Sequence, residues 1–155
     1  MKNKAITKMF GWLVFTAYLL LTLYFLFFAE WFGRTTLREG YSYNLVPLKE
    51  IRRFIEWGTS SETGFKAMVL NVFGNIACFM PFGFFAPINI KKLNNFAAVT
   101  VLTFMFSFCI EALQLVSRTG SFDVDDLILN TIGGALGYIG LKVIRSILVK
   151  KKRGN

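Results

Sequence analysis

The residues of this chain that can do chemistry are carboxylates and side-chain amides gathered in its second half. Glu111 and Gln114 lie near the end of one apolar run, and Asp123, Asp126 and Asn130 lead into the next. Carboxylate and amide oxygens suit a hard cation such as Mg²⁺ or Ca²⁺, or a polar ligand. A charged group at the centre of a membrane helix costs about 2.5 to 3.5 kcal/mol on insertion scales, so these residues mark a candidate functional site.

Other kinds of chemistry are excluded by composition. The chain contains no histidine, which rules out a Ser-His-Asp or Cys-His nucleophile pair and a His-ligated zinc or haem. Its two cysteines, Cys78 and Cys109, lack C-x-x-C spacing, and we expect free thiols. Any chemistry must therefore rest on carboxylates, amides, arginine or a hard cation.

The elements that must position these residues are membrane helices, because the chain is 54% hydrophobic and only 17% charged. Four apolar runs are each about long enough to cross a hydrocarbon core of about 30 Å. They cover residues 10–29, 67–88, 96–116 and 127–148. The first run is longer than the apolar part of a signal peptide, so we expect a permanent helix. The prediction is one all-α integral membrane domain over residues 1–155, a four-transmembrane-helix bundle.

The outer loop, residues 30–66, is too long for a tight turn and contains a helical pattern. Leu48, Ile51 and Phe54 recur at helical spacing opposite charged residues. This pattern predicts an interfacial amphipathic helix that begins after Pro47 and ends near Trp57. We expect this amphipathic segment to cover the polar residues of the spans.

Basic residues near the span ends predict the orientation, because lysine and arginine are retained on the cytoplasmic side. Both termini of this multi-pass membrane protein are predicted to be cytoplasmic. The inner side then carries Lys2, Lys4, Lys8, Lys91, Lys92, Lys142, Arg145, Lys150, Lys151, Lys152 and Arg153. The net charge of +9 is therefore an asymmetry across the membrane, and we expect no nucleic-acid partner.

Helical spacing predicts three polar stripes that converge in the outer half of the bundle. They consist of Asn71 and Asn75 in the second span, Glu111, Gln114 and Arg118 in the third, and Asp126 and Asn130 in the fourth, where the stripe continues through Gly133, Gly134 and Gly137. The glycines allow a neighbouring backbone to approach closely. Pro81, followed by Gly83, predicts a kink in the second span.

Plainer interpretations of the same residues stay open. The four amides, Asn71, Asn75, Gln114 and Asn130, can be interhelical hydrogen-bonding groups, each contributing about 0.6 kcal/mol on average. Asp123, Asp125 and Asp126 can cap the fourth span and complement its dipole. One aspartate would suffice for capping, so three indicate an additional role.

The motifs, in their order along the chain, resemble the VanZ family over residues 44–140. They are Asn44-Leu-Val-Pro47, Asn71-Val-Phe-Gly-Asn75, Phe79-Met-Pro81-Phe-Gly83, Glu111-Ala-Leu-Gln114, Asp123-Val-Asp-Asp126 and Asn130-Thr-Ile-Gly133-Gly134. The resemblance implies a small bacterial membrane protein associated with resistance to teicoplanin-type glycopeptides, without a change of the D-Ala-D-Ala target. Asp125 lies between the family's motif positions.

We therefore expect a non-enzymatic protein that binds a lipoglycopeptide or a lipid-linked peptidoglycan precursor in an outward-facing pocket. Membrane lipid is the further expected partner, and no cofactor is expected. The expected ligand-binding residues are Asn71, Asn75, Glu111, Gln114, Arg118, Asp123, Asp126 and Asn130, supported structurally by Pro81, Gly83, Gly133, Gly134 and Gly137.

Two alternatives come from other functional classes. The first is an intramembrane enzyme acting on a phosphorylated or diphosphate lipid, in which Glu111 and Asp126 hold a divalent cation and Arg118 contacts phosphate. A cation site of Glu111, Asp123 and Asp126 is the corresponding metal hypothesis. The second alternative is a structural scaffold of the cell envelope. The sequence leaves the oligomeric state open.

Overall fold

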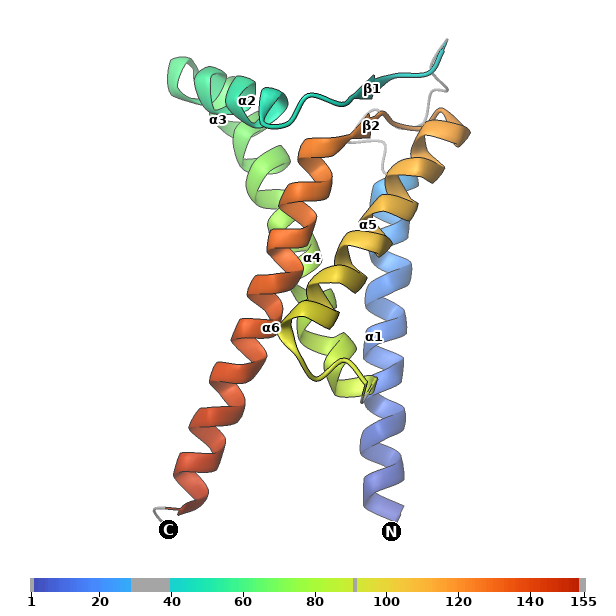
Figure 1. The fold of residues 1–155 in the computed structure, drawn as a ribbon, viewed down its shortest axis with the longest axis vertical. Helices are drawn as coiled ribbons and strands as arrows, with labels where there is room; N and C mark the ends of the chain where they lie inside the picture. The colour runs from blue at the N-terminus through green and yellow to red at the C-terminus, as the bar shows by residue number, and fades with distance from the viewer. Residues whose placement is uncertain (1, 29–39, 91, 154–155) are drawn as a thin grey trace.

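The computed structural model describes residues 2–28, 40–90 and 92–153, and these are almost entirely helical (Figure 1). The helices are α1 (Lys2–Phe28), α2 (Lys49–Ser60), α3 (Glu62–Met68), the π-helix η2 (Val69–Phe73), α4 (Gly74–Asn89), α5 (Phe96–Ser117) and α6 (Val124–Arg153). Two short strands, β1 (Tyr43–Asn44) and β2 (Phe122–Asp123), pair in parallel.

Four stretches are long and apolar enough to cross a membrane, namely Lys8–Phe27, Glu62–Asn89, Phe96–Ser117 and Val124–Lys151. The predicted all-α membrane fold with four spans is confirmed, and the amphipathic helix is present as α2. The second span begins at Glu62 rather than at residue 67, because Ser61 caps it: the Ser61 side chain accepts a hydrogen bond from Gly64 N at 3.0 Å. Residue 29, the predicted end of the first span, lies outside the described residues.

Regular α-helical hydrogen bonding in the second span is interrupted at η2, between α3 and α4. Pro81 and Pro87 both lie inside α4, which continues to Asn89. The predicted kink at Pro81 stays a prediction, and the π-helix is an irregularity that the sequence analysis missed.

The centre of the bundle is the contact between α4 and α6, where glycines bring the two backbones together. A Cβ atom on Gly83 would overlap the Gly134 carbonyl, and one on Gly137 would overlap the Met80 carbonyl. Gly133 lies equally close to the backbone of Ile76. Only glycine fits at these positions, as expected for close helix packing in membranes.

Aromatic rings attach α1 and α5 to this pair. Phe82 of α4 stacks on Phe106 of α5 with ring centroids 4.8 Å apart and lies 5.9 Å from the Phe15 ring of α1. Tyr18 of α1 donates a hydrogen bond to the Cys78 carbonyl at 2.7 Å. These contacts hold α1 against α4 near the middle of the second span.

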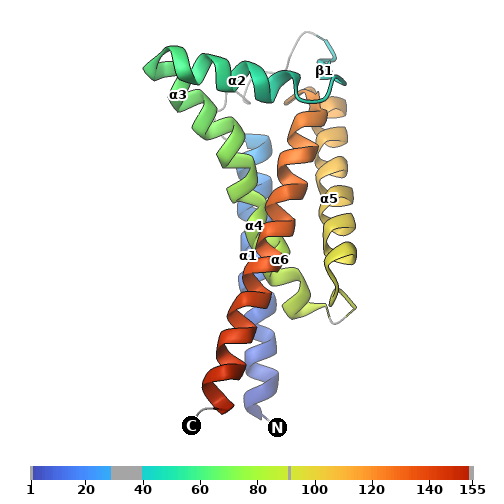
Figure 2. The same ribbon diagram turned by 60° about the vertical axis from the view of Figure 1, so that its left-hand side comes forward.

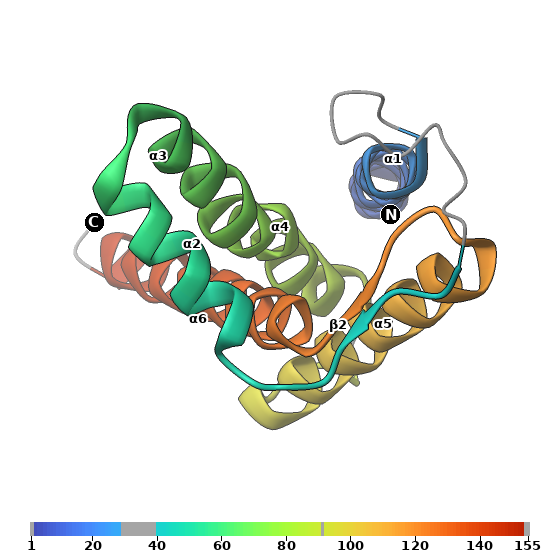
Figure 3. The same ribbon diagram turned by 90° about the horizontal axis from the view of Figure 1, so that it is seen from above.

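Helix α2 lies across one end of the bundle, which we call the α2 end (Figure 2). Seen from above, α2 passes over the end of α6 and continues into α3 (Figure 3). Both chain termini lie at the opposite end (Figure 1). The polar residues singled out in the sequence therefore belong to the end that α2 covers.

Candidate functional site

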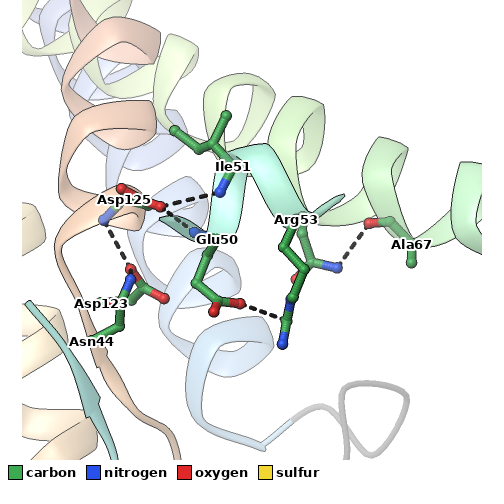
Figure 4. A network of polar contacts seen from close by, with 8 residues as sticks. Asn44, Glu50, Ile51, Arg53, Ala67, Asp123 and Asp125 are labelled. Atoms are coloured by element: carbon green, nitrogen blue, oxygen red, sulfur yellow. Dashed lines mark hydrogen bonds and ion pairs between the residues drawn. The ribbon is translucent and has the colours of Figure 1, made fainter. Parts of the chain in front are cut away.

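Asp125, in the first turn of α6, fastens α2 to the bundle. It is 1% exposed, and its two carboxylate oxygens accept hydrogen bonds from Leu48 N at 2.5 Å, Glu50 N at 2.7 Å and Ile51 N at 3.1 Å. Figure 4 shows the carboxylate directed at the start of α2. The first N–H groups of a helix have no partner within the helix, and a carboxylate there also complements the helix dipole.

The sequence analysis treated Asp125 only as a cap of its own helix and so missed this role. A signal was present in the chain. The residue at the N-cap position of α2 is Leu48, which has no side-chain acceptor and adopts a left-handed backbone conformation with φ 65°. A helix that starts without a capping side chain of its own needs an acceptor from elsewhere in the fold.

Asp123 connects the β1–β2 pair to both Asp125 and Glu111. Its Oδ1 accepts hydrogen bonds from Asn44 Nδ2 at 3.0 Å and from Asp125 N at 2.8 Å. Its own N–H donates to Glu111 Oε2 at 3.1 Å. Since Glu111 is 3% exposed, this carboxylate acts as a buried support for the loop that carries Asp123.

The two asparagines of the second span point to different partners. Asn75 Nδ2 donates to Asp126 Oδ1 at 2.5 Å and thereby joins α4 to α6. Asn71 is exposed and donates to the Ala67 carbonyl of its own span at 2.8 Å. Both side chains nevertheless line one cavity between α1 and the second span, so they share a face of the span although η2 ends between them.

Along α5, the buried face is polar over several turns. Gln114 Nε2 donates to the Leu26 carbonyl of α1 at 2.8 Å. Deeper in the bundle, Asn130 Nδ2 of α6 donates to Ser107 Oγ at 2.9 Å, with both side chains buried. The oxygen of the Asn130 amide accepts no hydrogen bond from the described residues. Ser107 was not singled out in the sequence.

Arg118 does not belong to the buried stripe of α5. The helix ends at Ser117, and Arg118 follows in a left-handed conformation with φ 58°. Its side chain is exposed, with the guanidinium 5.1 Å above the centre of the Tyr41 ring. The expected stripe of Glu111, Gln114 and Arg118 therefore stops at Gln114, because the helix terminates before the third residue.

A polar cavity of about 240 Å³ lies beneath α2. From α2 it is lined by Glu50 and Arg53, which form an ion pair at 2.5 Å. The expected binding residues among its walls are Asn71, Gln114, Asp123 and Asp126, and Asp125 joins them. Of the other expected residues, Glu111 and Asn130 are buried behind this wall and Arg118 lies outside it.

A second cavity of about 230 Å³ adjoins the first between α1 and the second span. It shares Asn71 and Asp126 with the polar cavity, and Asn75 also lines it. The remaining walls are mainly apolar and consist of Phe25, Leu26, Leu70, Gly74 and Cys78. The α2 end thus combines a polar and an apolar cavity that are neighbours and share Asn71 and Asp126 in their walls.

The metal hypothesis finds no support in the arrangement of the carboxylates. Within residues 2–28, 40–90 and 92–153, no group of three or more cysteine, aspartate or glutamate side chains is placed to hold a metal ion. Asp123 is hydrogen-bonded to Asn44 and to the Asp125 backbone, and Asp126 to Asn75. The cation site of Glu111, Asp123 and Asp126 stays a prediction.

Comparison with known proteins matches residues 15–145 to the VanZ/LLP1 family. The chain belongs to this family. Protein VanZ of Enterococcus faecium is 38% identical to it over 66 residues, which are 41% of this chain and 38% of that relative. No solved structure matches the chain. The VanZ resemblance of the motifs is thereby confirmed, although the aligned segment is less than half of the E. faecium protein.

In this VanZ-family chain the motif residues separate into two groups. The glycines and Pro81 lie along α4 and α6, where Gly83, Gly133 and Gly137 form the backbone contact. The acidic and amide residues lie at the α2 end, around the two cavities or directly behind them. The first group builds the bundle, and the second forms the candidate site.

Proposed function

We propose that this VanZ-family protein contributes to resistance against teicoplanin-type glycopeptides by binding the drug or a lipid-linked peptidoglycan precursor. A polar portion of the ligand enters the polar cavity under α2, which faces the outside of the bacterial cell membrane. The basic residues near the termini support this orientation, because they favour a cytoplasmic position for that end of the bundle.

The observation that carries the proposal is the polar cavity itself. Its walls hold three aspartates, two side-chain amides and the Glu50–Arg53 ion pair under a helix with one apolar and one charged face. Such a wall offers donors and acceptors to a ligand rich in amides and hydroxyls, while α2 excludes water from above. Both proposed ligands carry such groups and a lipid tail.

The test is drug susceptibility of a sensitive Gram-positive host that expresses the protein. We expect the wild type to protect against teicoplanin but not vancomycin, which has no acyl tail. Asp126→Asn, at the polar wall, should lose this protection. Glu62→Gln is the matched control, since Glu62 is an exposed carboxylate of α3 paired with Lys66. Immunoblots of the membrane fraction must show equal protein levels.

Two results would contradict the proposal. If no form of the protein protects against teicoplanin, its contribution to resistance is wrong. If the wild type protects cells but the purified protein binds neither teicoplanin nor lipid II, resistance does not depend on binding at this cavity.

A further inference from the structure

We infer that the apolar cavity between α1 and the second span binds one acyl chain of the ligand whose polar part occupies the cavity under α2. This inference rests on the proposed function and specifies the class of ligand. The ligand is an amphiphile with one or more acyl chains, and it inserts one of them into the cavity.

The walls of the cavity include exposed side chains of two membrane-spanning stretches. Phe25 of α1 and Leu70 of η2 line it and are 46% and 48% exposed. Both belong to membrane-spanning stretches, so their exposed surface faces acyl chains rather than water. A chain can therefore enter from the bilayer without crossing a polar barrier.

The cavity and the polar one share a wall, and this wall lies where an amphiphile would change character. Asn71 and Asp126 line both spaces, and Asn75 holds Asp126 through a hydrogen bond at 2.5 Å. Polar groups thus stand at the junction, with apolar side chains on one side and carboxylates and amides on the other. A ligand with a polar head and an acyl tail matches this sequence of surfaces, whereas a purely polar ligand leaves the apolar space unfilled.

Local structure explains why this space exists. Gly74 contributes no side chain, and a Cβ atom built on it would have only the Val69 carbonyl near it, at 3.8 Å. Tyr18 holds α1 to the Cys78 carbonyl at 2.7 Å, next to the cavity. The glycine at the end of the π-helix therefore leaves a gap beside a point where α1 is fixed.

The experiment uses purified protein in phospholipid nanodiscs with a trace of lysophosphatidylcholine that carries a diazirine in its acyl chain. After irradiation, mass spectrometry maps the labelled residues. We expect labelling concentrated on residues 25–26 and 70–78 of the wild type. Gly74→Leu should reduce it about tenfold, since leucine takes the space of several methylene groups. Gly140→Leu is the control, because a Cβ on Gly140 meets nothing within 4 Å.

A second measurement does not depend on the folding of a variant. In a Cys109→Ser background, N-ethylmaleimide is added to the folded protein so that the adduct on Cys78 fills the cavity. Because the adduct takes the place of the acyl chain, labelling of residues 25–26 and 70–78 should fall by an amount similar to that expected for the Gly74→Leu variant. The inference is overturned if label spreads evenly over exposed α5 residues such as Val101 and Met105, or if neither change reduces it.

Competition separates this inference from the proposed function. If Gly74→Leu reduces the labelling and teicoplanin also displaces the probe, the result supports both the acyl-chain site and the proposed function. If Gly74→Leu removes the label but teicoplanin does not displace it, the acyl site stands and drug binding is wrong.

Discussion

The middle of the bundle and its α2 end are held together by different forces. In the middle, α4 and α6 meet backbone to backbone at Gly83, Gly133 and Gly137. At the α2 end, glycine packing joins α2 only to α3, where a Cβ on Gly64 would overlap the Trp57 carbonyl. The start of α6 holds α2 and β1 by hydrogen bonds to the carboxylates of Asp123 and Asp125. Backbone packing thus joins α4 to α6, and polar contacts join α2 to α6.

The comparison teaches how a small membrane protein can combine a rigid scaffold with a site that opens. Backbone packing at glycines tolerates almost no displacement, because every added atom would overlap a neighbour. The hydrogen bonds between α2 and Asp125 can open while α4 and α6 stay packed, since water replaces such bonds at the membrane surface. We therefore expect motion at α2 and little between α4 and α6.

The largest effect is expected for Gly83→Leu. The new side chain has no space beside the Gly134 carbonyl, and overpacking of this kind costs about 1 to 3 kcal/mol or more. The variant should fail to give a monodisperse peak in size-exclusion chromatography after detergent extraction. Gly140→Leu, whose Cβ meets open space, should behave like the wild type. Equal behaviour of the two variants would contradict the glycine contact.

A smaller and more local effect is expected for Asp125→Ala. It removes the acceptor of three backbone N–H groups at the start of α2, and hydrogen bonds to a charged group contribute about 1.5 to 3 kcal/mol each. Hydrogen exchange at Glu50 and Ile51 should accelerate, while the amides of α4 and α6 stay protected.

Glu56→Gln is the matched control for that measurement, because Glu56 is an exposed carboxylate of α2 paired only locally with Arg52. If exchange in α4 and α6 rises together with that in α2, the two regions do not separate as we describe.

The smallest effect is expected for Tyr18→Phe. The change deletes the hydrogen bond to the Cys78 carbonyl but leaves the ring stacked on Phe15, 6.2 Å between centroids. Because hydrogen bonds between membrane helices contribute about 0.6 kcal/mol on average, we expect a small decrease of the unfolding temperature in detergent. A decrease as large as that of Phe82→Ala, which removes rings packed against α1 and α5, would show that polar contacts also hold the middle.

Much of the fold was predictable from the sequence, and the candidate site was predictable in part. The spans follow from runs of apolar residues, and α2 from helical spacing between Leu48 and Trp57, although it continues to Ser60. Asn71, Gln114, Asp123 and Asp126 do line the polar cavity. The sequence shows that Leu48 has no side-chain acceptor to cap α2, but it does not show that Asp125 supplies one or that α5 ends before Arg118.

By itself the sequence determined that the chain crosses a membrane and which helix faces are polar or glycine-rich, since these depend on local composition and on 3.6 residues per turn. Only the tertiary structure decided which polar groups meet. Asp125 is 75 residues from Glu50, at the start of α2. Asn75 and Asp126 are 51 residues apart. No local pattern encodes such pairings, because they arise when the glycines of α4 and α6 set the distance and rotation of the packed helices.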